Sequence, residues 1–326
     1  ASELENAKQK TPYSCEFERL EKERFSLLKK ASLRVCSDER QKIERVISAK
    51  KPIYDFCRFM ALKEANQYAE WIDWTEENYS ADTLLAWMFI EYEFLAQWSD
   101  IKSYANSRGI KIIGDIPIYV SPDGADVWAH PELFQLDEKN ESSSIAGCPP
   151  DSFSADGQVW GNPLYRWDFH RATGYEWWVT RMWHSFKLYD VVRIDHFRGL
   201  ESYWSVPAGD ETAIGGTWMP GPREDLFRAI QKALGKDLPI IAEDLGIITP
   251  EVDALRDAFA FPGMRILQFA FDSEEESAYH PHQFDTSNCV CYTGTHDNNT
   301  TQGWYNAASE EAKDKVRYYM NTDGNC

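Results

Sequence analysis

The chain has 326 residues and carries 34 Lys and Arg against 53 Asp and Glu, a formal net charge of −19. Such an acidic surface repels phosphate backbones and anionic lipids, which argues against nucleic acids and membranes as partners. Trp, Tyr and Phe make up 14% of the chain. Trp and Tyr combine an apolar face with a polar edge, so this excess suits a carbohydrate ligand as well as a large core.

Residues 1–109 are predicted to be mainly helical, and we expect them to form a helical insertion, or subdomain, of the main fold. Apolar residues recur at spacings of three and four among charged ones, which is typical of amphipathic helices. Gly109 follows the last of these segments, where a glycine commonly ends a helix. The expected helices cover residues 16–33, 52–74 and 81–108.

Beyond residue 110, short apolar runs replace this pattern, with helical segments between most of them. The runs are apolar throughout rather than alternating, which is typical of parallel strands covered on both faces. This alternation predicts an α/β fold, and we expect residues 110–326 to form the catalytic portion of a (β/α)₈ TIM barrel. The five predicted strands lie within residues 109–120, 188–195, 238–246, 263–272 and 289–297. The helices expected among them cover residues 175–188 and 223–234 and begin again at Thr249.

A long irregular stretch, residues 121–171, separates the first two runs. It contains five prolines and three tryptophans. Long loops in compact domains are usually functional or disordered, and the tryptophans argue against disorder. We therefore expect an ordered loop that covers the substrate.

Acidic residues stand at or just after the ends of four runs: Asp195, Glu243, Asp272 and Asp297. Catalytic residues of barrels lie at the carboxyl ends of the strands, so these acids are expected to converge. Two carboxyl groups flanking a glycosidic bond cleave it when one is ionised and the other protonated. Arg193 precedes Asp195 by two residues and projects to the same side of the strand, where its charge favours the ionised carboxylate.

Three segments around these acids are similar to the motifs of a known family. They are VRIDHFRG at residues 192–199, AEDLG at 242–246 and GTHDNNT at 294–300. These segments resemble the 4-α-glucanotransferases, the amylomaltases or disproportionating enzymes of glycoside hydrolase family 77 in the α-amylase clan. GDIPIYV at 114–120 and GQVWGNPLY at 157–165 also match, and the resemblance covers about residues 85–305.

The resemblance implies a retaining double displacement without a cofactor or a metal ion. Asp195 would be the nucleophile, and Glu243 would be the general acid/base. Asp297 would be the third catalytic acid, binding sugar hydroxyls and favouring ring distortion. The remaining residues that the resemblance assigns to substrate binding are Asp115, Trp160, Asn162, Arg193, His296 and Asp272.

The expected function is therefore transfer of a segment of a 1,4-α-glucan to the 4-hydroxyl of an acceptor glucan or glucose. Maltooligosaccharides and starch- or glycogen-like glucans would be donor and acceptor. Two alternatives remain open: an α-glucan hydrolase of the same clan, and a catalytically incomplete glucan-binding fragment. In a retaining enzyme the carboxyls of Asp195 and Glu243 are expected roughly 5–5.5 Å apart.

Two further expectations concern the setting of the chain. Seven cysteines without a Cys-x-x-Cys pair favour a reduced, cytoplasmic environment. Compared with the family it resembles, the chain lacks the first barrel strands and ends soon after the Asp297 motif. We therefore expect a barrel truncated at both ends, whose oligomeric state the sequence leaves open.

Overall fold

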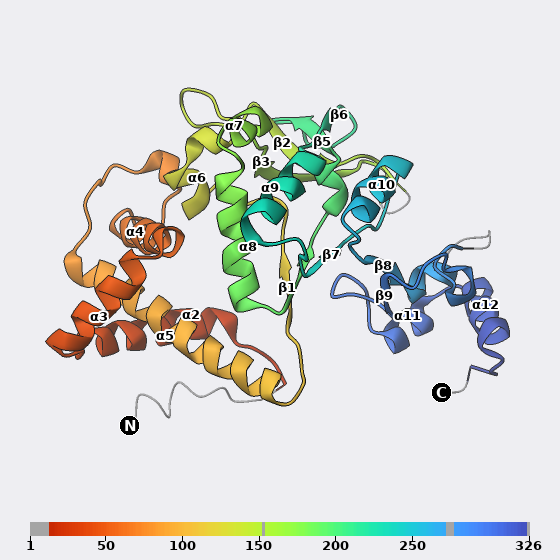
Figure 1. Ribbon diagram of the computed structural model, residues 1–326, viewed down its shortest axis with the longest axis horizontal. Helices are drawn as coiled ribbons and strands as arrows, with labels where there is room; N and C mark the ends of the chain where they lie inside the picture. Colours follow the sequence, from red (N-terminus) through yellow and green to blue (C-terminus); the bar gives the residue numbers. More distant parts are fainter. Residues whose placement is uncertain (1–12, 152–153, 272–276, 325–326) are drawn as a thin grey trace. The chain divides into compact units, whose positions relative to one another are not determined.

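The computed structural model describes residues 13–151, 154–271 and 277–324 (Figure 1). The chain forms two compact units. Unit 1 comprises residues 1–110, 119–145 and 161–169, and unit 2 comprises residues 111–118, 146–160 and 170–326. Unit 1 thus adds two later segments to the predicted helical region. The division into a helical subdomain of residues 1–109 and a barrel portion of residues 110–326 stays a prediction.

Long helices dominate the first part of unit 1. The helices are α2 (Phe17–Ser32), α3 (Ser37–Ser48), α4 (Lys51–Ala65) and α5 (Ala81–Ser107), with a short 3₁₀ turn, η1 (Trp71–Asp73). Their apolar faces enclose a buried cluster that includes Ile43, Ile47 and Trp87. No helix in the described part of the chain is both long enough and apolar enough to cross a membrane.

Helix α4 ends well before the predicted boundary at residue 74. Gln67 and Tyr68 both adopt positive φ angles, which helical backbone does not allow. The side chain of Asn66 accepts hydrogen bonds from the N–H groups of Thr75 and Glu76, at 3.0 and 2.9 Å. This small network replaces the helix by a fixed turn.

Gly109 ends helix α5 as predicted. Its φ is +74°, in the left-handed region that favours glycine. Its N–H donates to the Asn106 carbonyl at 2.9 Å, and the N–H of Ile110 donates to the Ala105 carbonyl at 3.0 Å. These two bonds satisfy carbonyl groups that the helix leaves unpaired at its end.

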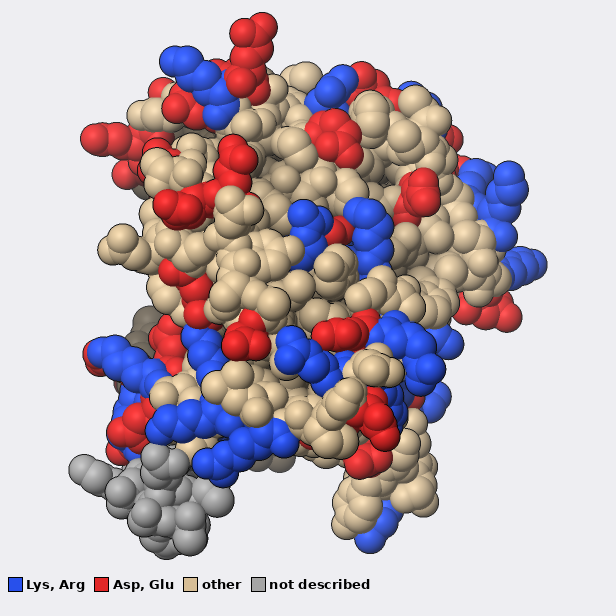
Figure 2. All heavy atoms as spheres, turned by 90° about the vertical axis from the view of Figure 1, so that its left-hand side faces the viewer, with Lys and Arg blue, Asp and Glu red and all other residues tan. Residues whose placement is uncertain are grey.

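Opposite charges alternate along the exposed faces of these helices. Lys22 lies 2.9 Å from Glu18, and Arg40 lies 3.2 Å from Glu44, each pair one helical turn apart. Figure 2 likewise shows Lys and Arg side chains interspersed with Asp and Glu side chains on the face that it presents. Exposed pairs of this kind stabilise a helix by only about 0.3–0.5 kcal/mol each, so packing of the apolar faces dominates.

The stretch of residues 121–171 is built from short elements rather than one irregular loop. They are α6 (Ala125–Ala129), η2 (Pro131–Leu133), β2 (Ser144–Cys148), β3 (Gln158–Pro163) and α7 (Trp167–Ala172). Trp128 packs against Phe59 and Trp74, and Trp167 against Tyr165. Two of the three tryptophans therefore take part in packing, while a substrate-covering role for the stretch stays a prediction.

All five predicted strands are present in unit 2. Strands β1 (Ile113–Ile116), β4 (Val191–Ile194) and β7 (Ile240–Ala242) form a parallel sheet in the order β1-β4-β7. Strands β8 (Gly263–Ile266) and β9 (Cys289–Tyr292) form a second parallel pair. The intervening helices are α8 (Glu176–Leu188), α9 (Glu224–Leu234) and α10 (Pro250–Ala258), and α8 contacts β4.

The described residues form further elements that the sequence pattern did not predict. Strands β5 (Ser202–Pro207) and β6 (Thr217–Pro220) form an antiparallel pair, in a four-stranded sheet of order β3-β2-β5-β6. A 3₁₀ turn, η3 (Phe197–Leu200), follows β4 directly, and η4 (Leu267–Phe271) follows β8. The turn η5 (Pro281–Gln283) precedes β9, and α11 (Thr301–Ala307) and α12 (Glu310–Met320) follow it.

Replacing Gly109 by Ala is expected to lower the free energy of unfolding by about 1–2 kcal/mol, because the Cβ atom of an L-residue destabilises the left-handed conformation. A Cβ atom at this position meets no other atom within 4 Å, so the loss reports backbone strain alone. Denaturant unfolding measures it. Gly109→Asn is the control and should lose less, since Asn tolerates this conformation. Equal stability of the Ala variant and the parent would contradict this account.

Candidate active site

Strands β4 and β7 place Asp195 and Glu243 at the same level, one residue beyond the end of each strand. Ile194 pairs with Ala242 in the parallel ladder. The ladder continues past the strands, since the Asp195 N–H donates to the Ile116 carbonyl at 3.0 Å and the Glu243 N–H to the Ile194 carbonyl at 3.1 Å. Adjacent strands lie about 4.8 Å apart, so the two carboxyl side chains leave neighbouring backbones on one face of the sheet.

Arg193 lies between two carboxylates. Its Nη1 donates to both oxygens of Asp115, at 2.7 and 2.6 Å, and lies 3.0 Å from Oδ1 of Asp195. Its Nε donates to the sulfur of Met264 at 3.3 Å. Burial by itself lowers the pKa of Arg193, but the surrounding carboxylates outweigh burial and raise it. The predicted position of Arg193, on the same side of the strand as Asp195, is confirmed.

The pKa of Asp195 is raised rather than lowered. Burial is the main cause, and the charges of Asp115 and Asp297 act in the same direction. Arg193 opposes them through its charge and its hydrogen bond. The expectation from the sequence considered Arg193 alone and missed the acids on its other side. Arg193 nevertheless favours the ionised form, as does contact with water, since the Asp195 side chain is 44% exposed.

Glu243 is the more strongly perturbed acid. Burial and the neighbouring charge of Asp195 raise its pKa to about 7. Arg193 and two backbone hydrogen bonds oppose this rise without cancelling it. In these bonds the His196 N–H donates to Oε2 at 2.8 Å, and the Leu245 N–H donates to Oε1 at 3.1 Å. Glu243 therefore keeps its proton to higher pH than an ordinary glutamic acid.

His196 connects the two acids through its backbone. Its φ of 53° is left-handed, which is uncommon for a residue other than glycine and is typical of functional sites. This conformation directs its N–H to Glu243. Its ring meets the indole of Trp160 edge-on, with ring centres 4.8 Å apart. Burial and the charge of Arg198 lower the pKa of His196 to about 4, so the ring is neutral at physiological pH.

Asp297 and His296 follow β9 and are exposed, with 72% and 70% of their side chains accessible. His296 Nε2 lies 3.3 Å from Oδ1 of Asp297. The N–H of Asp297 donates to the Thr295 hydroxyl at 3.2 Å, which fixes the local turn. The charge of Asp297 raises the pKa of Asp195, so the two acids interact electrostatically.

Asn162 and Asp272 are the two remaining predicted binding residues. Asn162 belongs to unit 1, where its Nδ2 donates to the Val120 carbonyl at 2.8 Å. That hydrogen bond holds backbone in place and leaves its expected role in acceptor binding a prediction. Asp272 lies outside the described residues.

Two residues of the site were not predicted as such. His196 supplies a hydrogen bond to Glu243, and Asp244, which is buried, lies next to Glu243 in the chain. Both stand inside the two motifs that predicted the acids. Their adjacency to the acids was the available signal, but local sequence does not reveal their hydrogen-bond partners.

Chemically, the arrangement provides two acids with different proton affinities on adjacent strands. Asp195 faces a guanidinium that favours its ionised form, while the rise in pKa is larger at Glu243. Such a pair can supply a nucleophile and a proton donor. Within the described ranges, no group of three or more His, Cys, Asp or Glu side chains is placed to hold a metal ion.

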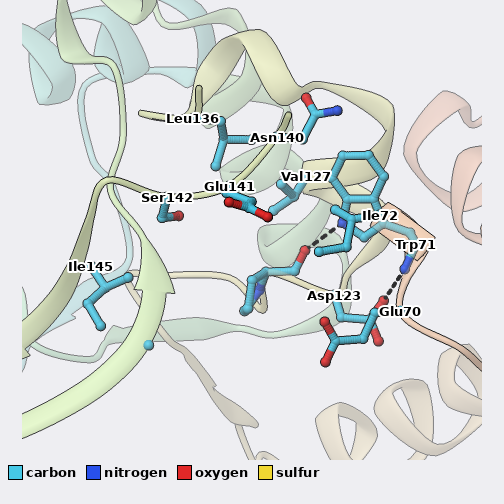
Figure 3. Close-up of a pocket in the computed structure, with 12 residues that line it drawn as sticks. Glu70, Trp71, Ile72, Asp123, Val127, Leu136, Asn140, Glu141, Ser142 and Ile145 are labelled. Atoms are coloured by element: carbon cyan, nitrogen blue, oxygen red, sulfur yellow. Dashed lines mark hydrogen bonds between the residues drawn. The ribbon is translucent and has the colours of Figure 1, made fainter. Parts of the chain in front are cut away.

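A separate cavity of about 220 Å³ lies in unit 1 (Figure 3). The indole N–H of Trp71 donates to the Pro122 carbonyl at 2.8 Å, and the Trp71 backbone N–H donates to Asp123 Oδ1 at 3.2 Å. Lys63 also pairs with Asp123. These bonds hold the wall of the cavity together. None of the predicted site residues lines it.

The family of the chain follows from comparison with known proteins. The model of glycoside hydrolase family 77, 4-alpha-glucanotransferase, matches residues 1–326. The chain belongs to this family. The resemblance seen in the sequence motifs is thereby confirmed.

Curated relatives of this family 77 chain carry the same description. The 4-alpha-glucanotransferase of Synechocystis sp. is 49% identical over 280 residues, which cover 82% of this chain and 55% of the relative. That of Clostridium butyricum is 43% identical over 318 residues, which cover 92% of this chain and 65% of the relative. The chain thus spans less than two thirds of the length of either relative.

A solved structure supports the fold. The amylomaltase from Streptococcus agalactiae in complex with acarbose matches 99% of this family 77 chain and 70% of its own chain, with 36% identity and a TM-score of 0.88. An amylomaltase from Corynebacterium glutamicum is 20% identical, with a TM-score of 0.72, and covers 93% of this chain and 42% of its own. The expected α/β barrel class is confirmed, with the parallel strands of unit 2 as the portion present here.

Replacing Glu243 by Gln is expected to stabilise the protein more at alkaline than at acidic pH. The pKa of Glu243 rises from 4.5 to about 7 on folding, so its contribution to stability is complete below the unfolded-state value and is lost as pH rises through about 7. Gln imitates the protonated carboxyl and never ionises. The relative gain above neutral pH should be on the order of 1 kcal/mol, because residual contact with water screens the buried charge.

Thermal unfolding of parent and variant at about pH 5 and about pH 8 measures this difference, since these conditions lie on either side of the raised pKa. If the amide of the Glu243→Gln variant fails to make a hydrogen bond, the resulting loss of stability is similar at both pH values and therefore cancels in the comparison. A difference between the two proteins that stays constant with pH would contradict the raised pKa.

Proposed function

We propose that the full-length protein is a 4-α-glucanotransferase that transfers a segment of a 1,4-α-glucan to the 4-hydroxyl of an acceptor glucan or glucose. The observation that carries this proposal is the pairing of Asp195, held by Arg193, with Glu243, whose pKa is raised to about 7. Membership of family 77 supports the same reaction. Because the chain spans only part of its relatives, the activity is assigned to the complete protein.

In the first step, a carboxylate oxygen of Asp195 attacks the anomeric carbon of the donor. The bond between that carbon and the 4-oxygen of the leaving glucan breaks, and the Glu243 proton goes to this oxygen. Arg193 holds Oδ1 of Asp195, which leaves the other oxygen for attack. The result is a glycosyl ester on Asp195 and an ionised Glu243.

In the second step, Glu243 takes the proton of the acceptor 4-hydroxyl. The acceptor oxygen attacks the anomeric carbon, and the bond between this carbon and the carboxylate oxygen of Asp195 breaks. Two displacements at one carbon retain the configuration of the donor. The retaining geometry requires carboxyl groups roughly 5–5.5 Å apart, and their origin on adjacent parallel strands is consistent with that requirement.

Transfer instead of hydrolysis requires that an acceptor sugar outcompetes water for the ester. Trp160 supports this assignment, because its indole contacts the ring of His196. His196 follows Asp195 in the chain, and its N–H donates to Glu243. An aromatic face beside the reacting carbon can hold a glucose ring and exclude water. Asn162 is assigned to the same acceptor.

The other assignments concern donor binding and setting. Asp115, Arg193, Asp297 and His296 would bind hydroxyls of the sugar at the cleavage site, and the charge interaction between Asp297 and Asp195 supports this. Starch- or glycogen-like glucans are the larger substrates proposed. The six described cysteines are all free thiols, which fits the proposed cytoplasmic location.

Incubation of the full-length protein with maltotriose tests the proposed reaction. Transfer should yield glucose together with a ladder of longer maltooligosaccharides, which chromatography separates. An α-glucan hydrolase would instead release only glucose and maltose. Binding without any product would favour the glucan-binding alternative.

The Glu243→Gln variant tests the acid/base assignment. Gln keeps the shape of the side chain but supplies no proton, so the transfer rate should fall by about 10²–10⁴-fold or more. Binding of maltooligosaccharides, measured by calorimetry, should change little. Transfer at the parental rate would show that Glu243 is not the acid/base.

A further inference from the structure

The segment that follows β7, residues 243–248, carries the proposed acid/base and is called the acid/base loop below. It has no regular secondary structure. The backbone of Glu243 continues the strand ladder, since its N–H donates to the Ile194 carbonyl and its carbonyl accepts the Phe197 N–H, each at 3.1 Å. Beyond Glu243, the position of the loop depends on side-chain contacts. Two such contacts hold it, one at Asp244 and one at the carbonyl of Ile247, to which Arg198 donates.

Asp244 is one of the most completely buried acids in the described structure, with 2% of its side chain exposed. Its Oδ1 accepts the N–H of Met264 at 2.6 Å, at the beginning of β8. Its Oδ2 accepts a hydrogen bond from Arg256 Nη1 at 2.5 Å, and Arg265 lies 3.6 Å away. A single carboxylate thus joins the acid/base loop to strand β8 and to helix α10.

Arg256, the partner of Asp244, is also buried and surrounded by carboxylates. It is 8% exposed, and its guanidinium lies 2.9 Å from Asp253 and 2.9 Å from Asp257, both on or beside α10. The carboxylates of Asp257 and Asp244 raise the pKa of Arg256 despite its burial. A buried ion pair of this kind tolerates the loss of either partner poorly, because an unpaired charge then remains in the interior.

The backbone around Asp244 leaves no space for adjustment. A Cβ atom on Gly263 would lie 2.3 Å from Oδ2 of Asp244. The carboxylate therefore packs directly against the first residue of β8, and the absence of a side chain at position 263 permits this approach. These contacts fix the position of the acid/base loop relative to β8.

This anchor acts on Glu243 through the peptide backbone. Asp244 stands between Glu243 and Leu245, and the Leu245 N–H donates to Oε1 of Glu243 at 3.1 Å. A shift of Asp244 would rotate the peptide that carries this N–H. The other backbone donor, from His196, belongs to a different segment and would stay in place.

We propose that Asp244, held by Arg256, is a positioning residue that orients the Glu243 carboxyl by fixing the Leu245 N–H. The inference rests on the proposed function of Glu243 as acid/base. Asp244 touches no reacting atom in this account. Its effect reaches the reaction only through the orientation and the proton affinity of Glu243.

Steady-state kinetics of Asp244→Asn in the full-length protein, with maltotriose as substrate, tests the proposal. The Asn oxygen can still accept the Met264 N–H, but the pairing with Arg256 is lost. We expect kcat to fall by about 10-fold to 10²-fold, the range that a small misplacement of a catalytic group produces, with KM changed much less. Loss of the Leu245 hydrogen bond removes an interaction that favours the ionised carboxylate, so the alkaline limb of kcat/KM should move to higher pH.

Asp253→Asn is the matched control. Asp253 also contacts Arg256, but its side chain is 47% exposed and does not belong to the acid/base loop. This variant should keep both the parental kcat and the parental pH profile. If Asp244→Asn does not fold, Arg256→Lys replaces it as the test. Lys keeps the positive charge but lacks the planar guanidinium that holds Asp244, so this variant should show the same shift of the alkaline limb.

An Asp244→Asn variant with an unmoved alkaline limb, or with the same kinetics as Asp253→Asn, would overturn the proposal. That result is distinguishable from failure of the proposed function. If Glu243→Gln retains transfer, Glu243 is not the acid/base. If Glu243→Gln is inactive while Asp244→Asn behaves like its control, only the positioning role is wrong.

Discussion

The rest of the site depends on the ion pairs that the guanidinium of Arg193 forms. The guanidinium bridges Asp115 on β1 and Asp195, one residue beyond β4, and its charge also reaches Glu243, one residue beyond β7. Three carboxylates on adjacent strand ends would repel one another without a cation among them. The parallel register of β1, β4 and β7 places Asp115 opposite Arg193, and brings Asp195 and Glu243 to a common level two residues further on, so sheet geometry and charge balance support each other.

The sequence predicted the elements that carry this arrangement, because they depend on local pattern. Buried parallel strands produce continuous apolar runs, and all five runs became strands. Acids at strand ends were visible for the same reason, and so was the contact between Arg193 and Asp195 two residues away. The barrel class followed from the alternation of elements.

Other features could not be predicted because they depend on partners distant in sequence. The pKa of Asp195 reflects Asp115, which is 80 residues earlier, since 195 − 115 = 80. The left-handed turn at His196 and the pairing of Asp244 with Arg256 likewise arise only after folding. Composition was ambiguous too: the tryptophans of residues 121–171 divide between packing, at Trp128 and Trp167, and the neighbourhood of His196, at Trp160.

The charge of Asp195 has a consequence for the timing of the proposed reaction. That charge helps to keep Glu243 protonated. Once Asp195 forms an ester it is neutral, and this contribution disappears while Arg193 and the backbone N–H groups remain. The proton affinity of Glu243 then falls in the intermediate and recovers when the ester is released. The enzyme would thus alternate between two electrostatic states, each set by the covalent state of its nucleophile, without any movement of the backbone.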